Sequence, residues 1–498
     1  MKLRSAFLFL SLSFLLLSCN FEALAQTIPE QLDRLFTSRQ YPVNGNVLVA
    51  ENGKTIYKRS FGFADAKNKL LNNEDSRFQL ASITKIFTST AVLQIRDKGK
   101  LNLDDPYIKY FPDFPYPEIT IRHLLSHTSG LPDLQIFEDL VEKYPDKAFT
   151  NADVIPALKM WKKPLQSKPG EAWSYSNSGY CLLALLIEKL SGTKFEDYVR
   201  EQIFTPAKMN DSYFETDDLA SSDSKKAKEQ RYPLIFDTEL KGVADEKWKR
   251  ITGNGGIIST TDDLLKFDQA LYSGKLLKQS SMDEAFTPEK LTNGKNARTS
   301  TLDALYGLGW FIFEDESAGK IVWHGGGRPG IATVLLRNLT RRQTVVVFDN
   351  SFNRETYRIG VNAMNILNGK AIDIRKKSLA HDYALTLIEK GADAAFCKLI
   401  ELKSNTATYY LDEDEMNDLA LQLLYAGTSA NHNELALEVA KLNIAFFPDS
   451  FNVYDTYGEI LAKIGTKEMA IEMYRKSIFI NPKNEGGKKA LAKLLKED

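Results

Sequence analysis

Strand-forming segments occupy two places that lie far apart in this chain of 498 residues. Near the start, residues 46–50 and 55–64 are rich in apolar side chains, and Asn52-Gly53 between them is a strong signal for a tight hairpin turn. Four later segments are short, β-rich and separated by turn residues: 309–313, 321–324, 331–336 and 344–349. Because helical patterns fill the interval, we predict an α+β fold in which the early and late strands form one antiparallel sheet.

A chain of this length exceeds what one hydrophobic core usually supports, so we expect two domains. From about Lys376 onward the pattern is helical only, and Pro448 and Pro482 lie 34 positions apart. Small or aromatic residues keep the same offsets from the two prolines, namely Ala436 with Ala470 and Ala440 with Tyr474. This period resembles the tetratricopeptide repeat, as does the large, large, small, large series Tyr454, Tyr457, Gly458 and Leu461.

The resemblance implies an all-α repeat domain over residues 376–498, in which the helices between Lys376 and Leu424 form a degenerate unit or a cap. Tetratricopeptide grooves bind peptides or proteins, so a protein partner is expected for this domain. A plain helical bundle is the alternative interpretation.

The N-terminus has the pattern of a secretory signal over residues 1–25. Lys2 and Arg4 precede an apolar run over 6–17, which is too short to cross a bilayer comfortably. Leu16-Leu17-Ser18-Cys19 resembles a bacterial lipobox, which would leave Cys19 as a lipidated N-terminus, whereas Ala23-Leu24-Ala25 is an ordinary small-residue cleavage site. We favour lipidation and expect a place in the bacterial cell envelope, either periplasmic or anchored to the membrane through Cys19 alone.

Composition excludes some partners. Lys and Arg number 64 against 65 Asp and Glu, so no electrostatic feature indicates binding to nucleic acid. Cys181 and Cys397 are both expected to be buried thiols, and no disulfide framework is predicted. His123 and His127 have the spacing of a metal pair on a helix, but no glutamate lies between them, and we expect neither a metal nor a cofactor.

Ser82-Ile83-Thr84-Lys85 opens an amphipathic helical pattern. A serine at a helix N-terminus, with a lysine on the same face one turn later, has the features of a nucleophile beside its proton acceptor. The same spacing recurs at Ser191/Lys194, Ser222/Lys225 and Ser317/Lys320, none of which opens a long amphipathic helix. An ordinary helix cap is the alternative for Ser82.

Two further motifs could complete a site for acyl transfer. Tyr175-Ser176-Asn177 precedes an apolar helix and would hold a phenol for proton transfer beside an amide that could bind a substrate carbonyl. Trp323-His324-Gly325-Gly326-Gly327 ends a predicted strand, and its glycines would let a substrate lie against backbone N–H groups. The alternatives are an aromatic plug with a helix cap for the first motif and a glycine-rich hairpin turn for the second.

The three motifs, in this order, resemble the serine β-lactamase and penicillin-binding protein superfamily, specifically its class C-like branch. Three further stretches are similar to the family: 101–106, 123–132 and 253–260. The resemblance implies a hydrolase domain over residues 26–370 with a β-lactamase-like antiparallel sheet and a helical region. It implies Ser82 as nucleophile, Lys85 as its proton acceptor and Tyr175 as general acid and base. It places Asn177, His324, Gly326 and Gly327 in substrate binding, with Gly327 as an oxyanion donor.

The function implied is that of a secreted serine hydrolase that forms an acyl-enzyme with an amide or ester, such as a D-amino acid peptide, an ester or a β-lactam. His324 stands where class C β-lactamases have lysine, and a mostly uncharged side chain weakens the grip on a substrate carboxylate. This favours peptidase or esterase chemistry over antibiotic hydrolysis. The alternative is a non-catalytic cell-envelope scaffold that binds protein partners through its repeats.

Overall fold

The computed structural model describes residues 27–37, 43–144, 146–161, 163–231, 241–242, 251–315, 317–351, 353, 355–373, 376–426 and 430–496. The predicted signal sequence with Cys19 lies outside these residues, as do residues 232–240 and 243–250. The chain divides into two compact units, and the second takes up the chain from residue 373 onward together with a short segment over 231–241. No described helix is both long and apolar enough to span a membrane.

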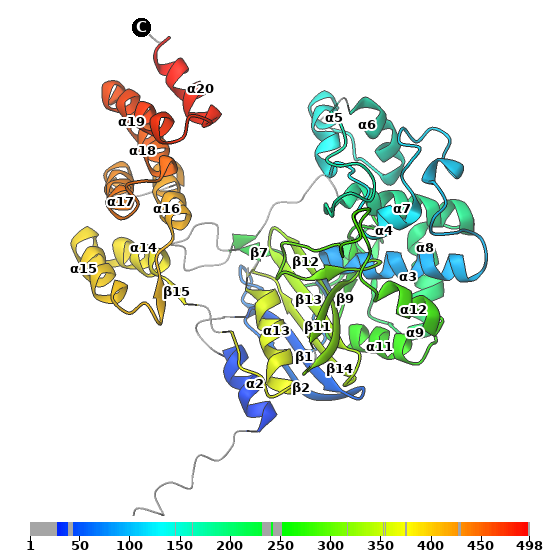
Figure 1. Cartoon of the computed structure of the whole chain (residues 1–498). Helices are drawn as coiled ribbons and strands as arrows, with labels where there is room; N and C mark the ends of the chain where they lie inside the picture. Colours follow the sequence, from blue (N-terminus) through cyan, green and yellow to red (C-terminus); the bar gives the residue numbers. More distant parts are fainter. Residues whose placement is uncertain are drawn as a thin grey trace, which may run out of the picture. The chain divides into compact units, whose positions relative to one another are not determined.

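A seven-stranded antiparallel sheet forms the centre of the first unit (Figure 1). Its order is β10-β11-β12-β13-β14-β1-β2, so the early hairpin lies beside the last of the late strands. The strands are β1 (Gly45–Glu51), β2 (Lys54–Phe61), β10 (Leu305–Tyr306), β11 (Phe311–Asp315), β12 (Gly319–Arg328), β13 (Ile331–Asn338) and β14 (Gln343–Asp349). The predicted α+β fold with one sheet built from early and late strands is confirmed. At the hairpin turn, Asn52 and Gly53 both have positive φ, which is the conformation that the Asn-Gly pair favours.

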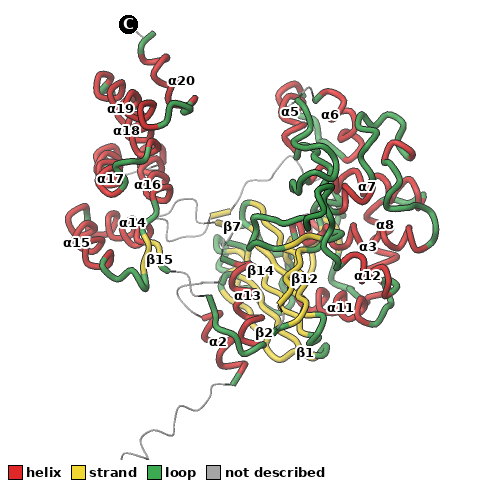
Figure 2. Tube along the Cα trace, in the orientation of Figure 1, coloured by secondary structure: helices red, strands yellow, loops and turns green. Residues whose placement is uncertain are grey.

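Helices cover both faces of this sheet, as Figures 1 and 2 show. Side chains alternate along each strand, so Val47 and Val345 face a core with α2 (Ile28–Thr37) and α13 (Thr356–Leu367). Leu48 and Val346 face the larger core, to which α3 (Thr84–Asp97) and α7 (Asn177–Ser191) also contribute. The helices of this region are α3 (Thr84–Asp97), α4 (Ile121–Leu125), α5 (Glu138–Lys143), α6 (Val154–Met160), α7 (Asn177–Ser191), α8 (Phe195–Val199), α9 (Thr205–Ala207), α10 (Leu219–Ser222), α11 (Thr261–Tyr272) and α12 (Gln279–Ala285).

Short elements join these parts. The short strands are β3 (Phe63–Asp65), β4 (Leu70–Leu71), β5 (Phe78–Gln79), β6 (Tyr213–Phe214), β7 (Gln230–Arg231), β8 (Lys241–Gly242) and β9 (Ile257–Ser259). Single helical turns of other types are η1 (Ala81–Ile83), η2 (Tyr107–Lys109), η3 (Leu134–Phe137), η4 (Asn151–Asp153) and η5 (Arg200–Phe204). The three-stranded sheet β5-β9-β6 brings the segment before Ser82 against residues 257–259.

From residue 376 onward, the described part of the second unit is helical apart from the strand pair β15 (Lys377–Ser378) and β16 (Tyr409–Tyr410). Its helices are α14 (Leu379–Lys390), α15 (Ala392–Lys403), α16 (Glu413–Ala426), α17 (His432–Phe446), α18 (Phe451–Lys463), α19 (Lys467–Ile480) and α20 (Glu485–Leu494). Neighbouring helices pack in pairs around one apolar cluster, and a Cβ on Gly458 would lie 3.3 Å from the ring of Tyr474. A small residue is therefore needed where α18 meets α19. A helical C-terminal region is thus present.

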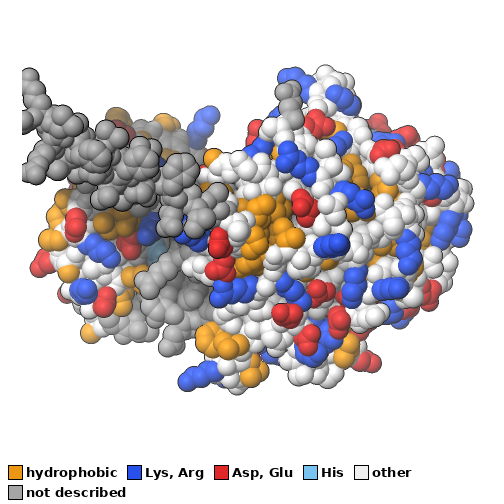
Figure 3. Space-filling view, turned by 90° about the horizontal axis from the view of Figure 1, so that it is seen from below, with side chains coloured by type: hydrophobic (Ala, Val, Ile, Leu, Met, Phe, Trp, Pro, Cys, Tyr) orange, Lys and Arg blue, Asp and Glu red, His pale blue; other side chains and the backbone are white. Residues whose placement is uncertain are grey.

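The two thiols have different environments. Cys181 is buried in α7, as expected, but Cys397 is exposed on α15, so the expectation that both are buried was wrong for Cys397. The apolar neighbours of Cys397 in the sequence include Phe396 and Ile400, which are also exposed on this helix. Basic and acidic side chains are intermixed over the part of the surface that Figure 3 colours, in keeping with the balanced composition.

Candidate active site

Ser82 lies in the helical turn η1, directly before α3. Ala81 precedes it with φ 47°, a left-handed conformation that side chains rarely adopt, and its N–H donates to the side chain of Gln79. Ser82 is partly exposed whereas Lys85, one turn later, is completely buried. The structure therefore places a hydroxyl at the helix N-terminus above a buried amine, as the sequence motif predicts.

Lys85 Nζ has three oxygen neighbours. It donates to Ser82 Oγ at 3.1 Å, to Asn177 Oδ1 at 2.6 Å and to the carbonyl of Asn254 at 2.9 Å. Burial lowers the pKa of Lys85 to about 7, although the carboxylate of Asp133 raises it in part. Near neutral pH a substantial fraction of the amine is therefore uncharged and can accept the proton of the hydroxyl that it contacts.

Tyr175 completes the group around the hydroxyl. Its side chain shares a hydrogen bond with Ser82, and Lys85 Nζ lies 4.8 Å from the centre of its ring. Burial raises the pKa of Tyr175 well above its usual value, so the phenol keeps its proton and can donate it. The Ser82 hydroxyl, the Lys85 amine and the Tyr175 phenol, which the sequence motifs predicted to form a site, thus lie together at one place.

His127 supports the loop that carries Tyr175. Its Nδ1 accepts a hydrogen bond from the backbone N–H of Ser176 at 3.1 Å, and its ring centre lies 4.3 Å from that of Tyr175. His123 instead accepts from the backbone N–H of Thr120 at 3.2 Å. The two histidines therefore accept hydrogen bonds from different backbone segments. Among the residues that the structure describes, no group of three or more His, Cys, Asp or Glu side chains could hold a metal ion.

Asn177 is the first residue of α7, and two hydrogen bonds to Asp133 fix its position. Asp133 Oδ1 accepts the backbone N–H of Asn177 at 2.8 Å, and its Oδ2 accepts the side-chain amide at 3.0 Å. The amide oxygen of Asn177 is thereby turned toward Lys85. Sequence reasoning did not assign a role to Asp133. The sequence feature that could have indicated a role for Asp133 is its position directly after the family-like stretch that ends at Pro132.

Strand β12 extends beyond its neighbour at the site. Its pairing with β11 ends at Trp323, opposite Phe311, whereas its pairing with β13 continues to Arg328. The backbone from His324 onward therefore forms an edge beside Ser82. The ring of His324 is buried, its Nδ1 donates to the carbonyl of Gly325 at 2.7 Å, and its Nε2 accepts from the hydroxyl of Tyr306 at 3.3 Å. Burial, together with nearby Lys85, lowers the pKa of His324 to about 3, so the ring is neutral.

The three glycines after His324 face different neighbours. A Cβ on Gly326 would lie 2.2 Å from the carbonyl oxygen of Leu80, and one on Gly325 would lie 2.5 Å from the ring of Tyr357. A Cβ on Gly327 would meet only the Tyr357 hydroxyl, at 3.3 Å. Gly326 therefore lets β12 approach the segment before Ser82, and Gly325 makes room for Tyr357. Only Gly327, of these three, borders both of the cavities next to Ser82.

Those two cavities meet at Ser82. One, of about 320 Å³, is lined by Tyr175, His324 and four other aromatic side chains, namely Trp173, Phe311, Trp323 and Tyr357. The other, of about 160 Å³, is lined by Asn177 and by the ion pair of Glu215 with Arg328. A substrate can therefore extend from the hydroxyl in two directions.

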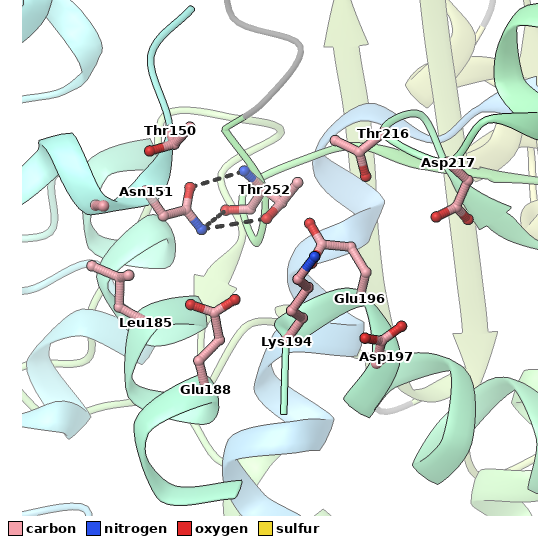
Figure 4. Close-up of a pocket in the computed structure, with 11 residues that line it drawn as sticks. Thr150, Asn151, Leu185, Glu188, Lys194, Glu196, Asp197, Thr216, Asp217 and Thr252 are labelled. Carbon is pink, nitrogen blue, oxygen red and sulfur yellow. Dashed lines mark hydrogen bonds between the residues drawn. The ribbon is translucent and has the colours of Figure 1, made fainter. Parts of the chain in front are cut away.

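A third cavity, of about 380 Å³, lies behind the loop that binds Lys85 (Figure 4). Asn151 in its wall donates to the carbonyl of Thr252 at 3.1 Å and accepts the N–H of Thr252 at 3.0 Å. Thr88 Oγ1 donates to the next carbonyl, that of Gly253, at 2.7 Å. These contacts hold the backbone that leads to Asn254, whose carbonyl accepts from Lys85. The cavity thus adjoins a support of the site and contains none of the predicted site residues.

Known proteins resemble this chain over most of the first unit. The Beta-lactamase family model matches residues 32–365. Penicillin-binding protein 4* of Bacillus subtilis (strain 168) is 34% identical over 400 residues, which are 78% of this chain and 86% of that protein. The crystal structure of a penicillin-binding protein from Bacillus halodurans has 26% identity and a TM-score of 0.56, and the match covers 68% of this chain and 98% of that one.

A D-amino acid amidase from Ochrobactrum anthropi SV3, in a structure with L-phenylalanine, shares the fold. It has a TM-score of 0.56 at 24% identity, over 68% of this chain and 96% of that one.

Proposed function

Because this chain belongs to the β-lactamase family of serine hydrolases, we propose that it is an active hydrolase that forms an acyl-enzyme through Ser82. The observation that carries the proposal is the 3.1 Å contact between Lys85 Nζ and Ser82 Oγ in a site where burial lowers the pKa of the amine to about 7. A scaffold that only bound ligands would not need a buried amine kept partly neutral beside a hydroxyl.

The mechanism follows from these contacts. Ser82 Oγ attacks the carbonyl carbon while its proton passes to Lys85, and the carbonyl oxygen becomes an oxyanion that the N–H groups of Ser82 and Gly327 would stabilise. The bond to the leaving group then breaks, and the leaving atom takes a proton from Tyr175, which is restored from Lys85. Water attacks the resulting ester by the same route in reverse and releases the acid and the free enzyme.

The substrate class we propose is an amide or ester, such as a D-amino acid peptide, a simple ester or a β-lactam. Two features favour peptidase or esterase chemistry over antibiotic hydrolysis. The His324 ring is neutral, and both of its nitrogens are engaged within the protein. It therefore offers no charge to a substrate carboxylate.

Covalent labelling tests the proposal. A fluorescent phosphonate or a labelled penicillin is expected to modify the wild-type chain and to leave Ser82→Ala unmodified. Ser222→Ala is the matched control, because Ser222 and Lys225 have the same spacing but lie on the exposed helix α10 and the segment after it. Equal labelling of Ser82→Ala and the wild type would exclude the assignment.

We also propose that the second unit is a tetratricopeptide-like domain that recruits a peptide or protein partner to the hydrolase. The paired helices and the close contact of Gly458 with Tyr474 support this. Capture of a partner by the full chain, with no acyl-enzyme in any labelling experiment, would favour the scaffold alternative instead.

The relatives named as penicillin-binding proteins support a place in the cell envelope, and we propose attachment through Cys19. Incorporation of labelled palmitate by the wild type, and its loss in Cys19→Ala, would test this.

A further inference from the structure

The two cavities that meet at Ser82 differ in which catalytic group they contain. Both are lined by Ser82 and Gly327, but Tyr175 lines only the larger cavity and Asn177 only the smaller one. Because Tyr175 must donate its proton to the atom that leaves, this atom has to lie within hydrogen-bond reach of the phenol. The rest of the leaving group then extends into the larger cavity, and the acyl group extends toward Asn177.

The larger cavity is aromatic and uncharged. Phe311 stacks on Trp323 with ring centres 4.4 Å apart, and the ring of Tyr357 lies 5.9 Å from that of Trp323. Ser300 and Thr301 contribute hydroxyl groups at its margin. No Lys, Arg, Asp or Glu occurs among the described residues that line it. The one titratable ring that could carry a positive charge, that of His324, uses Nδ1 as a donor to Gly325 and Nε2 as an acceptor from Tyr306.

The smaller cavity, in contrast, is lined by charged side chains. Arg328 Nη1 lies 3.1 Å from Glu215 Oε2, and the side chain of Glu215 is only 4% exposed. Glu229 and Lys226 extend this network, with contacts of 3.0 Å to Arg328 and 3.4 Å to Glu215. Polar and charged groups are therefore concentrated on the acyl side of the nucleophile, away from Tyr175.

We propose that the natural leaving group is a neutral aromatic or apolar alcohol or amine that carries no carboxylate. This inference rests on the proposed hydrolase function and specifies its substrate class. When the bond between the acyl carbon and the leaving oxygen or nitrogen breaks, that atom takes the proton of Tyr175 and departs as a neutral molecule through the aromatic cavity. A leaving group with a free carboxylate would have to lose its water there without gaining a cation.

A matched pair of esters tests the inference. Phenyl acetate and 3-carboxyphenyl acetate transfer the same acyl group and release phenols of similar acidity, but the second releases a carboxylate with the phenol. We expect kcat/KM to be about 10-fold or more higher for phenyl acetate, because the unpaired carboxylate is desolvated in the cavity. Equal kcat/KM values, or a preference for the carboxylate ester, would overturn the inference.

A variant makes the test independent of folding defects. Thr301→Arg places a cation at the partly exposed margin of the aromatic cavity, and it should reduce the preference for phenyl acetate several-fold. Thr193→Arg, at an exposed position after α7, is the control and should leave the preference unchanged. An unchanged preference in Thr301→Arg would contradict the inference.

The same measurements separate this inference from the function on which it rests. If the wild type hydrolyses neither ester faster than Ser82→Ala does, the hydrolase function fails and the inference fails with it. If it hydrolyses both esters equally well through Ser82, only the inference fails.

Discussion

Asp133 accepts two hydrogen bonds from Asn177, one from the backbone N–H at 2.8 Å and one from the side-chain amide at 3.0 Å. The second bond decides which end of the amide faces the active site. With the amide nitrogen bound to Asp133, the oxygen is left for Lys85 Nζ, at 2.6 Å. Asp133 therefore positions Lys85, the proposed proton acceptor, through Asn177.

We predict that Asp133→Asn shifts the pH dependence of the reaction. The carboxylate raises the pKa of Lys85, so its removal should lower that pKa and move the acid limb of kcat/KM below pH 7. The groups that also interact with Lys85 or pack against it are Tyr175, Tyr180, Cys181, His127 and His324. All of these remain in the variant. We further expect kcat to fall about 10-fold as the amide of Asn177 loses its orientation.

A pH profile of ester hydrolysis for both proteins would check this. Asp105→Asn is the control, since Asp105 also accepts backbone and side-chain hydrogen bonds but lies in another loop. An acid limb in Asp133→Asn that matches the wild type would contradict the positioning role.

Lys85→Arg should abolish acyl-enzyme formation, with a loss of about 10³-fold in rate. A guanidinium keeps its charge at every relevant pH and cannot accept the proton of Ser82. The rate of labelling by a phosphonate would measure this. Lys225→Arg preserves an ion pair with Asp75 far from the site and should label at the wild-type rate. Labelling of Lys85→Arg at that same rate would mean that another group takes the proton.

Asn151→Ala is expected to lower both stability and activity. It removes the amide that satisfies the N–H and the carbonyl of Thr252, and leaving such groups unpaired in a buried place costs about 1–3 kcal/mol. The loop to Asn254 would loosen, and Lys85 would lose a fixed acceptor. The midpoint temperature of thermal unfolding and the rate of covalent labelling should therefore both decrease. Asn68→Ala, in an exposed turn, should change neither; a stable and fully active Asn151→Ala would contradict the proposed support.

Alanine substitutions at two neighbouring glycines should have unequal effects. In Gly326→Ala the new methyl group would meet the backbone oxygen of Leu80 at 2.2 Å, so β12 or the segment before Ser82 must move. Overpacking of this kind costs about 1–3 kcal/mol. In Gly327→Ala the nearest atom is a tyrosine hydroxyl at 3.3 Å, which can shift. Urea unfolding of the two variants would measure the difference, and equal stability would show that β12 has more room than the structure indicates.

Several features of this protein could be predicted from the sequence because they depend on residues close together in the chain. Asn52-Gly53 specified its turn through φ preferences alone, and the alternation of Val47 and Leu48 specified the two faces of a strand. Ser82 and Lys85 share one face of a helical turn wherever that turn lies. Such patterns predicted the sheet, the candidate nucleophile and the family-like motifs.

Only the tertiary structure decided the features that depend on contacts between distant segments. Asp133 became a support of Lys85 because its loop packs on the start of α7, and Asn254 contributes only a backbone carbonyl, which any residue could supply. Cys397 lies in an apolar stretch, yet it is exposed on α15, so the apolar character of the local sequence predicted the wrong environment. The separation of an aromatic cavity from a charged one at Ser82 likewise follows from which side chains meet there, because burial and charge at a site are sums over many long-range neighbours.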